Sequence, residues 1–324
     1  MWAKMAAMNN AVCSSSRGRA TPLALGLALL LTLSLCAPVG AASAPFLPEA
    51  PRCPIFPISN VWNKPVAGLP VRADSDTLIR SIGLNAYLHP DFSSYDGGGY
   101  GIPYNVVGGG RKKKYVKFSY ASESDRGPYP IPRRPKIEGG SDRHMLIVDR
   151  DNCVLYELYA ARKTSTGWKA GSGAIWNLNS NALRPLGWTS ADAAGLPILP
   201  GLVRYDEVGA GVIRHALRFT APITRRAYIF PARHFAADSN DASLPPMGLR
   251  VRLKASVDIS HFGPQARVLL QALKDYGMIL ADNGSPWYVT GAPNAGWDDD
   301  DMHDLHSLHG SDFEVVDTSA LGNG

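Results

Sequence analysis

Glycine and proline are spread so densely along this chain that long helices have little room to form. The 324 residues include 32 glycines and 25 prolines. Proline interrupts helices and the interior of sheets because it has no backbone N–H to donate. Residues 125–135, DRGPYPIPRRP, can for this reason only be an extended loop. The chain therefore predicts a mainly β fold with many turns and few long helices.

The clearest local pattern is a hairpin over residues 144–159, HMLIVDRDNCVLYELY. Two apolar segments flank Asp151 and Asn152, which tolerate the backbone conformation of a tight turn. A two-residue turn at that point pairs Leu146 with Glu157. A register shift of one residue would move every side chain of one strand to the opposite face.

Further strands and two helices complete the expected fold. Strands are expected over residues 115–120, 173–178, 215–220, 226–230, 249–253, 278–281, 287–290 and 313–316. Helices are expected over residues 74–82 and 263–276, where capping residues and apolar spacing agree. We expect a single β-sandwich-like domain of the jelly-roll type, with two or three short helices packed at its edge.

An apolar segment near the N-terminus predicts a secretory signal. Two arginines precede an apolar run from Pro22 to about Cys36, and small residues suited to cleavage follow. A membrane anchor needs about 20 continuous apolar residues, and this run is shorter and ends in a helix breaker. We therefore expect residues 1–44 to be removed. Residues 45–324 would form one secreted domain, extracellular or periplasmic, that begins with the proline-rich segment 45–57 and does not associate with a membrane.

Removal of the signal would leave two of the four cysteines, Cys53 and Cys153. In an oxidising compartment these two most simply form one disulfide, and the alternative is a pair of buried free thiols. Their wide separation excludes a compact zinc knuckle. The formal net charge of +5 is modest for this length, so we expect no nucleic-acid partner.

The predicted hairpin also carries the first candidate site. On one face of it, His144, Glu157 and Tyr159 are close enough for their side chains to touch. A carboxyl group beside aromatic rings can have a raised pKa and act as a general acid. The alternative is a solvated outer face with a structural ion pair.

A second candidate cluster surrounds the strand HALRFT. His215 shares a face with apolar residues and is expected to point inward, where Asp206 or Glu207 could be its hydrogen-bonding partner. Arg218 lies on the opposite face, and His234 follows the next expected strand. Imidazoles beside carboxylates suit proton transfer or metal binding, and the alternative is a set of satisfied core histidines.

A third candidate is the segment Asp282-Asn283-Gly284, followed by Trp287. We interpret it as a polar lip at a sheet edge beside an aromatic ring on which a sugar could stack. The alternative is an ordinary turn.

The acidic stretch from Asp298 to Asp304, DDDDMHD, offers oxygen ligands for calcium. It lacks the spacing and the glycine of an EF-hand, so a solvated acidic turn is favoured and no cofactor is expected. The chain also contains no Gly-x-Ser-x-Gly, HExxH or Walker sequence, so the familiar hydrolase, zinc-protease and nucleotide-binding motifs are absent.

Several segments resemble a known group of sequences: HALRFT, GWTSADAAGLPILPGLVRYDE, PPMGLRVRLKA and YGMILADNGSPWY. They resemble a widespread group of secreted, mostly bacterial proteins of unknown function, sometimes attached to carbohydrate-related modules. The resemblance begins near CPIFPISNVWN and covers nearly the whole mature chain. It implies a single extracellular domain and favours a polysaccharide partner, but it transfers no activity and no catalytic residues.

These observations predict a carbohydrate-active protein, either a glycoside hydrolase or a polysaccharide lyase. Two carboxylates usually flank the bond that a glycosidase cleaves. The expected catalytic residues are Glu157, Asp206, Glu207 and His144, and the expected substrate-binding residues are His215, Arg218, His234, Tyr159, Asp282, Asn283 and Trp287. The substrate would be an extracellular polysaccharide or a cell-wall glycan. The alternative is a non-catalytic carbohydrate-binding module or a structural wall or matrix protein.

Overall fold

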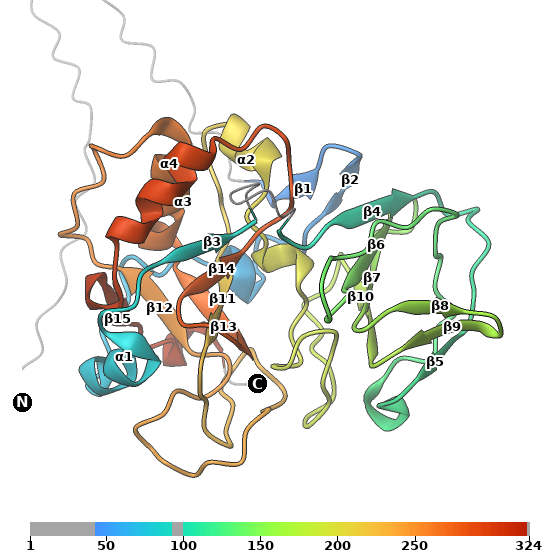
Figure 1. Cartoon of the computed structure of the whole chain (residues 1–324), viewed down its shortest axis with the longest axis horizontal. Helices are drawn as coiled ribbons and strands as arrows, with labels where there is room; N and C mark the ends of the chain where they lie inside the picture. The colour runs from blue at the N-terminus through green and yellow to red at the C-terminus, as the bar shows by residue number, and fades with distance from the viewer. Residues whose placement is uncertain (1–42, 93–99, 323–324) are drawn as a thin grey trace, which may run out of the picture. The chain divides into compact units, whose positions relative to one another are not determined.

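A computed structural model describes residues 43–92 and 100–322, which fold into four sheets and several short helices (Figure 1). The predicted signal lies outside these residues, apart from its last two positions. The mainly β class expected from the sequence is confirmed. The four α-helices are α1 (Ser75–Gly83), α2 (Tyr205–Gly209), α3 (Pro264–Asp275) and α4 (Asp299–His303). None of the helices in the described part of the chain is long and apolar enough to cross a membrane.

The four-stranded sheet has the order β10-β7-β6-β4. Its strands are, in that order, Gly173–Asn177, Val154–Leu158, Met145–Asp149 and Tyr104–Val107. Strands β6 and β7 form the predicted hairpin, and the predicted pairing of Leu146 with Glu157 is confirmed. All five residues of β6 are buried, which explains why its first four residues form a continuous apolar run instead of an alternating pattern.

The six-stranded sheet has the order β15-β12-β13-β11-β14-β3. Its strands are, in that order, Phe313–Val315, Arg250–Leu253, Met278–Asn283, Leu217–Ala221, Tyr288–Thr290 and His89–Asp91. Helices α1 and α3 bury apolar faces in the core of this sheet, through Leu78 and Leu273 among others. Helix α3 ends at Asp275, and Gly277 follows its C-cap with a φ of 65°, the left-handed conformation that glycine adopts without strain.

Two smaller sheets flank the four-stranded sheet. The three-stranded sheet has the order β5-β9-β8, with strands Val116–Phe118, Gly167–Ala170 and Arg162–Thr164, and the two-stranded sheet pairs β1 (Phe46–Leu47) with β2 (Ala50–Pro54). Trp168 of β9 shares a core with Met145 and Tyr156. Leu47 of β1 shares another core with Leu146 and Leu155. The four-stranded sheet is therefore covered on both faces.

The strand pairing is mixed, whereas the strands of a jelly roll run antiparallel. The parallel pairs are β4 with β6, β5 with β9, β11 with β13 and β14 with β3. The connections between parallel partners span many residues, because a parallel pair cannot be joined by a tight turn. This pairing differs from the jelly-roll arrangement that the sequence suggested.

The predicted disulfide between Cys53 and Cys153 is confirmed, with a Cα–Cα distance of 5.1 Å. It joins β2 to the turn of the β6–β7 hairpin. Two cysteines that are 100 positions apart in the sequence therefore meet beside the four-stranded sheet.

Candidate functional site

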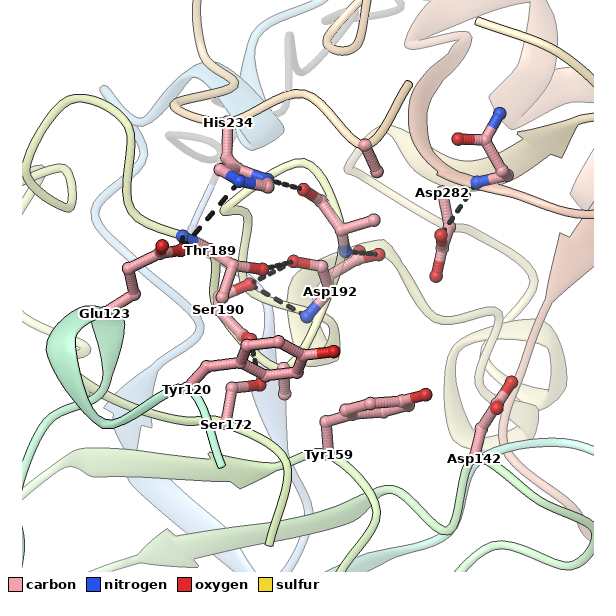
Figure 2. Close-up of a pocket in the computed structure, with 14 residues that line it drawn as sticks. Tyr120, Glu123, Asp142, Tyr159, Ser172, Thr189, Ser190, Asp192, His234 and Asp282 are labelled. Carbon is pink, nitrogen blue, oxygen red and sulfur yellow. Dashed lines mark hydrogen bonds and ion pairs between the residues drawn. The ribbon is translucent and has the colours of Figure 1, made fainter. Parts of the chain in front are cut away.

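A pocket of about 470 Å³ is lined by residues from distant parts of the sequence. The loop 189–193 forms one wall of the pocket, and the end of β13 forms another. Residues beside the three- and four-stranded sheets complete the lining (Figure 2). Its titratable lining residues are Tyr120, Glu123, Asp142, Tyr159, Asp192, His234 and Asp282. The volume falls within the range of small-molecule sites.

Hydrogen bonds within the loop 189–193 hold its shape. The Ser190 hydroxyl lies 2.9 Å from the Asp192 carbonyl oxygen and 2.5 Å from the Leu196 carbonyl oxygen. The Asp192 amide donates back to Ser190 Oγ at 2.9 Å. Arg184 Nε donates to the Thr189 carbonyl at 2.7 Å. The loop therefore presents its side chains to the pocket from a fixed backbone.

Asp192 and Arg218 form an ion pair at the base of the pocket. Arg218 extends from β11 and donates from Nη2 to Asp192 Oδ1 at 2.9 Å and from Nε to Oδ2 at 3.2 Å. Its Nη1 donates to Thr290 Oγ1 of β14 at 2.6 Å. Both charged residues are buried, with 1% and 4% of their surfaces exposed. The guanidinium group is therefore buried and held by two side chains, and Arg218 is not among the residues that line the pocket.

Asp282 lies at the end of β13 and reaches the pocket with a half-buried carboxyl group. Its Oδ1 accepts a hydrogen bond from the Asn283 amide at 2.7 Å. Burial and the nearby Asp192 charge raise the pKa of Asp282 to about 7, although Arg218 opposes this shift. Burial also raises the pKa of Asp192, and the Arg218 guanidinium opposes that shift by favouring the charged carboxylate.

A second carboxyl group and two aromatic rings lie near Asp282. Asp142 is exposed, and Figure 2 shows its carboxyl group and that of Asp282 directed toward the same end of the pocket. Tyr120 and Tyr159 also line the pocket, and Tyr120 is 54% exposed. Tyrosine rings offer apolar faces with a polar edge, a combination suited to sugar rings and their hydroxyl groups.

His234 is held at the rim with a defined tautomer. Its Nδ1 lies 2.8 Å from the Ala193 carbonyl oxygen, which can only accept, so Nδ1 carries the hydrogen. Its Nε2 lies 3.9 Å from Glu123 Oε2. That carboxylate also accepts the Thr189 amide at 3.1 Å. Nε2, which faces Glu123, is therefore the ring atom that can form a hydrogen bond to a ligand.

His144 lies behind the loop and fixes its position. Its Nδ1 is 2.6 Å from Glu138 Oε2, and its Nε2 is 3.0 Å from the Ala191 carbonyl oxygen. Burial alone would lower the pKa of His144, but the Glu138 carboxylate outweighs burial and raises it. Both ring nitrogens face acceptors, so the protonated imidazolium satisfies this geometry. His144 supports the pocket without being one of the residues that line it.

Glu157 is also separated from the pocket. It is fully buried, and its carboxylate accepts the amides of Ile198 and Leu199 at 2.9–3.0 Å. Burial raises its pKa to about 7, although these two amides oppose the shift. Glu157, the predicted general acid, therefore positions the 3-10 helix that starts at Leu199.

Other predicted residues form a separate cluster. His215 is buried and its Nε2 lies 2.9 Å from Glu207 Oε2, the partner that the sequence suggested. Glu207 Oε1 lies 2.7 Å from Arg204 Nη2, and Asp206 lines a different hollow together with Arg204. The structure does not bring Asp206, Glu207 or His215 to the pocket that Asp282 lines.

Trp287 lies in the core and does not form the expected aromatic platform. Its exposed fraction is 0%, and its ring stacks between Phe219 and Phe313 at centroid distances of 5.6 and 5.1 Å. Its Nε1 donates to the Gly83 carbonyl at 2.7 Å. A stacked position between two phenylalanine rings leaves neither face of the indole for a sugar.

The acidic stretch from Asp298 to Asp304 caps helices. Asp298 accepts the Asp301 amide at 3.1 Å at the start of α4. Asp301 is buried and accepts the Gln265 and Ala266 amides at the start of α3. Among the described residues, no group of three or more His, Cys, Asp or Glu side chains is arranged to hold a metal ion.

Four of the expected residues, Tyr159, His234, Asp282 and Asn283, line the pocket. Sequence reasoning missed the other acids and Tyr120. Asp142 lies in a loop and Glu123 ends the 3-10 helix Ala121–Glu123, neither with a recognisable spacing. Asp192 stands among alanines in ADAAG, which predicts only a turn. Arg218 on the predicted strand HALRFT was the available signal, because a charge that is buried on a strand requires an acidic partner.

No family model, curated protein or solved structure matches this chain.

Proposed function

We propose that this protein is a secreted glycoside hydrolase that acts on an extracellular polysaccharide in the pocket described above. Asp282 would be the general acid, and Asp142 would be the second carboxylate. The observation that carries the proposal is the difference between these two environments. The pKa of Asp282 is raised to about 7, whereas Asp142 is exposed at the same pocket. Carboxyl groups with unlike environments can divide the acid and base roles.

In the proposed reaction, Asp282 donates its proton to the glycosidic oxygen as the bond to the anomeric carbon breaks. The Asp142 carboxylate either attacks that carbon or activates the water that does so, depending on the separation of the two groups. Tyr120 and Tyr159 would pack against sugar rings, and His234 Nε2 would bind a hydroxyl group. Asp192 would keep the proton on Asp282 without touching the substrate.

Hydrolysis is favoured over the lyase reaction because none of the described residues that line the pocket is an arginine. A lyase acting on a uronate needs a cation to hold the substrate carboxylate, and Arg218 is engaged by Asp192 and Thr290. The acidic lining also repels a uronate. We therefore propose a neutral polysaccharide or cell-wall glycan as the substrate.

The same proposal includes secretion and a sandwich-like domain. The apolar segment that ends near Cys36 and the disulfide between Cys53 and Cys153 support export to an oxidising compartment. The core shared by Trp168 and Met145 supports face-to-face packing of the three- and four-stranded sheets.

The proposal is tested by incubating the purified protein with neutral polysaccharides, uronates and peptidoglycan and analysing products by mass spectrometry. Wild type should release saturated oligosaccharides from one neutral polymer, at a rate that falls as the pH rises above about 7 and Asp282 loses its proton. Asp282→Asn should be slower by about 100-fold or more. Asp300→Asn, which changes an exposed acid of α4, is the matched control and should retain full activity.

Three outcomes would contradict the proposal. Unsaturated product ends would identify a lyase. Retention of the protein on a polymer without products would identify a binding module. Products that persist in Asp282→Asn would place the acid elsewhere.

A further inference from the structure

The outer face of the three-stranded sheet carries a row of three cations. Lys117 of β5 pairs directly with Lys169 of β9, which in turn pairs with Arg162 of β8. Residues directly opposite each other on neighbouring strands share a face. The adjacent row, Val116 with Trp168, points to the core. The cationic row therefore points to solvent, and all three residues are exposed.

This row works against the stability of the sheet. Like charges directly opposite on neighbouring strands repel one another. None of the described acidic side chains forms an ion pair with Lys117, Lys169 or Arg162. An anion from outside the chain would remove this repulsion.

The surroundings extend the positive charge and add an aromatic ring. The basic segment 111–114, RKKK, leads into β5, and its Lys112 is exposed. Tyr115 precedes Lys117 by two positions and is 76% exposed. The nearby carboxylate of Asp125 is occupied by Arg184, with Nη1 at 2.7 Å from Oδ2. The surface thus combines cations, held by a hydrogen-bonded sheet, with a solvent-exposed ring.

We infer that this cationic face, formed by Lys117, Arg162, Lys169 and Tyr115, binds an anionic polysaccharide. Neighbouring strands are separated by about 4.8 Å, so the three cations span roughly 10 Å across the sheet. An acidic glycan supplies both a series of carboxylate or sulfate groups for this row and sugar rings for Tyr115. A membrane surface would also call for several inserted apolar side chains, and Tyr115 is the one exposed ring among these four residues. The inference does not depend on the activity of the pocket.

The test measures binding of polygalacturonate by the purified protein, with a neutral glucan as the reference polymer. The variant Lys117→Gln, Arg162→Gln, Lys169→Gln should bind polygalacturonate roughly 100-fold more weakly, since each cation near an anionic surface contributes about fivefold. The slope of log affinity against log salt should become shallower by about 2. The matched control, Arg80→Gln, Arg214→Gln, Arg267→Gln, removes three exposed charges elsewhere and should bind within a few-fold of wild type.

Stability provides a second readout that separates lost binding from lost folding. Removing the repulsion should leave the thermal midpoint of the triple variant equal to or higher than that of wild type. Lys169→Glu places a carboxylate between two cations, so it should stabilise the sheet while weakening binding more than Lys169→Gln does.

The inference would be overturned if the triple variant bound polygalacturonate as wild type does, or if the control lost affinity equally. It would also be overturned if Lys169→Glu, folded and stable, bound normally. Retention of the protein on anionic vesicles or DNA, with none on polygalacturonate, would assign the face to a different partner and reject the polysaccharide.

Discussion

Arg218 and Asp192 carry opposite charges in an interior that excludes water. Such a pair gains from mutual attraction but loses hydration, so its net contribution to stability is small while both partners are present. Removing one partner leaves the other charge buried and unpaired, which is costly. The loss of one partner should therefore destabilise the protein more than the presence of the intact pair stabilises it.

We expect Arg218→Met to lower the free energy of unfolding by about 3–5 kcal/mol, because it leaves Asp192 unpaired. Asp192→Asn should also destabilise the protein, since it leaves Arg218 buried without a countercharge. The double variant should lose less stability than the two single losses added together. Urea denaturation of the four proteins measures this coupling, and additive losses would show that the ion pair does not act as a unit.

At the scale of elements, the sequence predicted the β6–β7 hairpin and its register because both depend on neighbouring residues. The same pattern could not show what Glu157 contacts, since Ile198 lies 41 positions away. An acid in an apolar strand can face solvent, a substrate or backbone amides. The sequence pattern around the acid is the same in each case. The strand expected over residues 226–230 did not form, and its place is taken by a single bridge between Tyr228 and Met247.

Glu157 should give the protein a measurable dependence of stability on pH. Its pKa is about 7 in the folded state and near 4.5 in the unfolded chain, so the folded state binds the proton more tightly. This group therefore lowers stability progressively as the pH rises from about 4.5 to 7. Glu157→Gln removes the effect, and its stability relative to wild type should rise by about 2–3 kcal/mol between pH 5 and pH 8. Urea denaturation at the two pH values measures the change, and a constant difference would mean that Glu157 is already ionised at pH 5.

At the scale of the whole molecule, the sequence predicted the β class and the disulfide but not the arrangement of the sheets. The short strands His89–Asp91 and Arg162–Thr164 lack a pattern long enough to recognise, and each depends on pairing with a partner. The β3–β14 pair joins segments about 200 residues apart. The pocket is lined by segments spread between residues 120 and 283, so Asp282 could be predicted as polar and turn-forming, but its position near Asp142 could not.

The disulfide is the longest-range covalent constraint in the described residues, and removing it should destabilise the whole domain. It closes a loop of 100 residues between Cys53 and Cys153, and a link of that length restricts the unfolded chain strongly. We expect the double variant Cys53→Ser, Cys153→Ser to lose about 3–5 kcal/mol of unfolding free energy. Chemical denaturation measures the loss, and a thiol reductant should reproduce it in wild type but leave the variant unchanged. A loss below about 1 kcal/mol would mean that apolar contacts of Leu47 and Ile55 already hold the N-terminal segment on the four-stranded sheet.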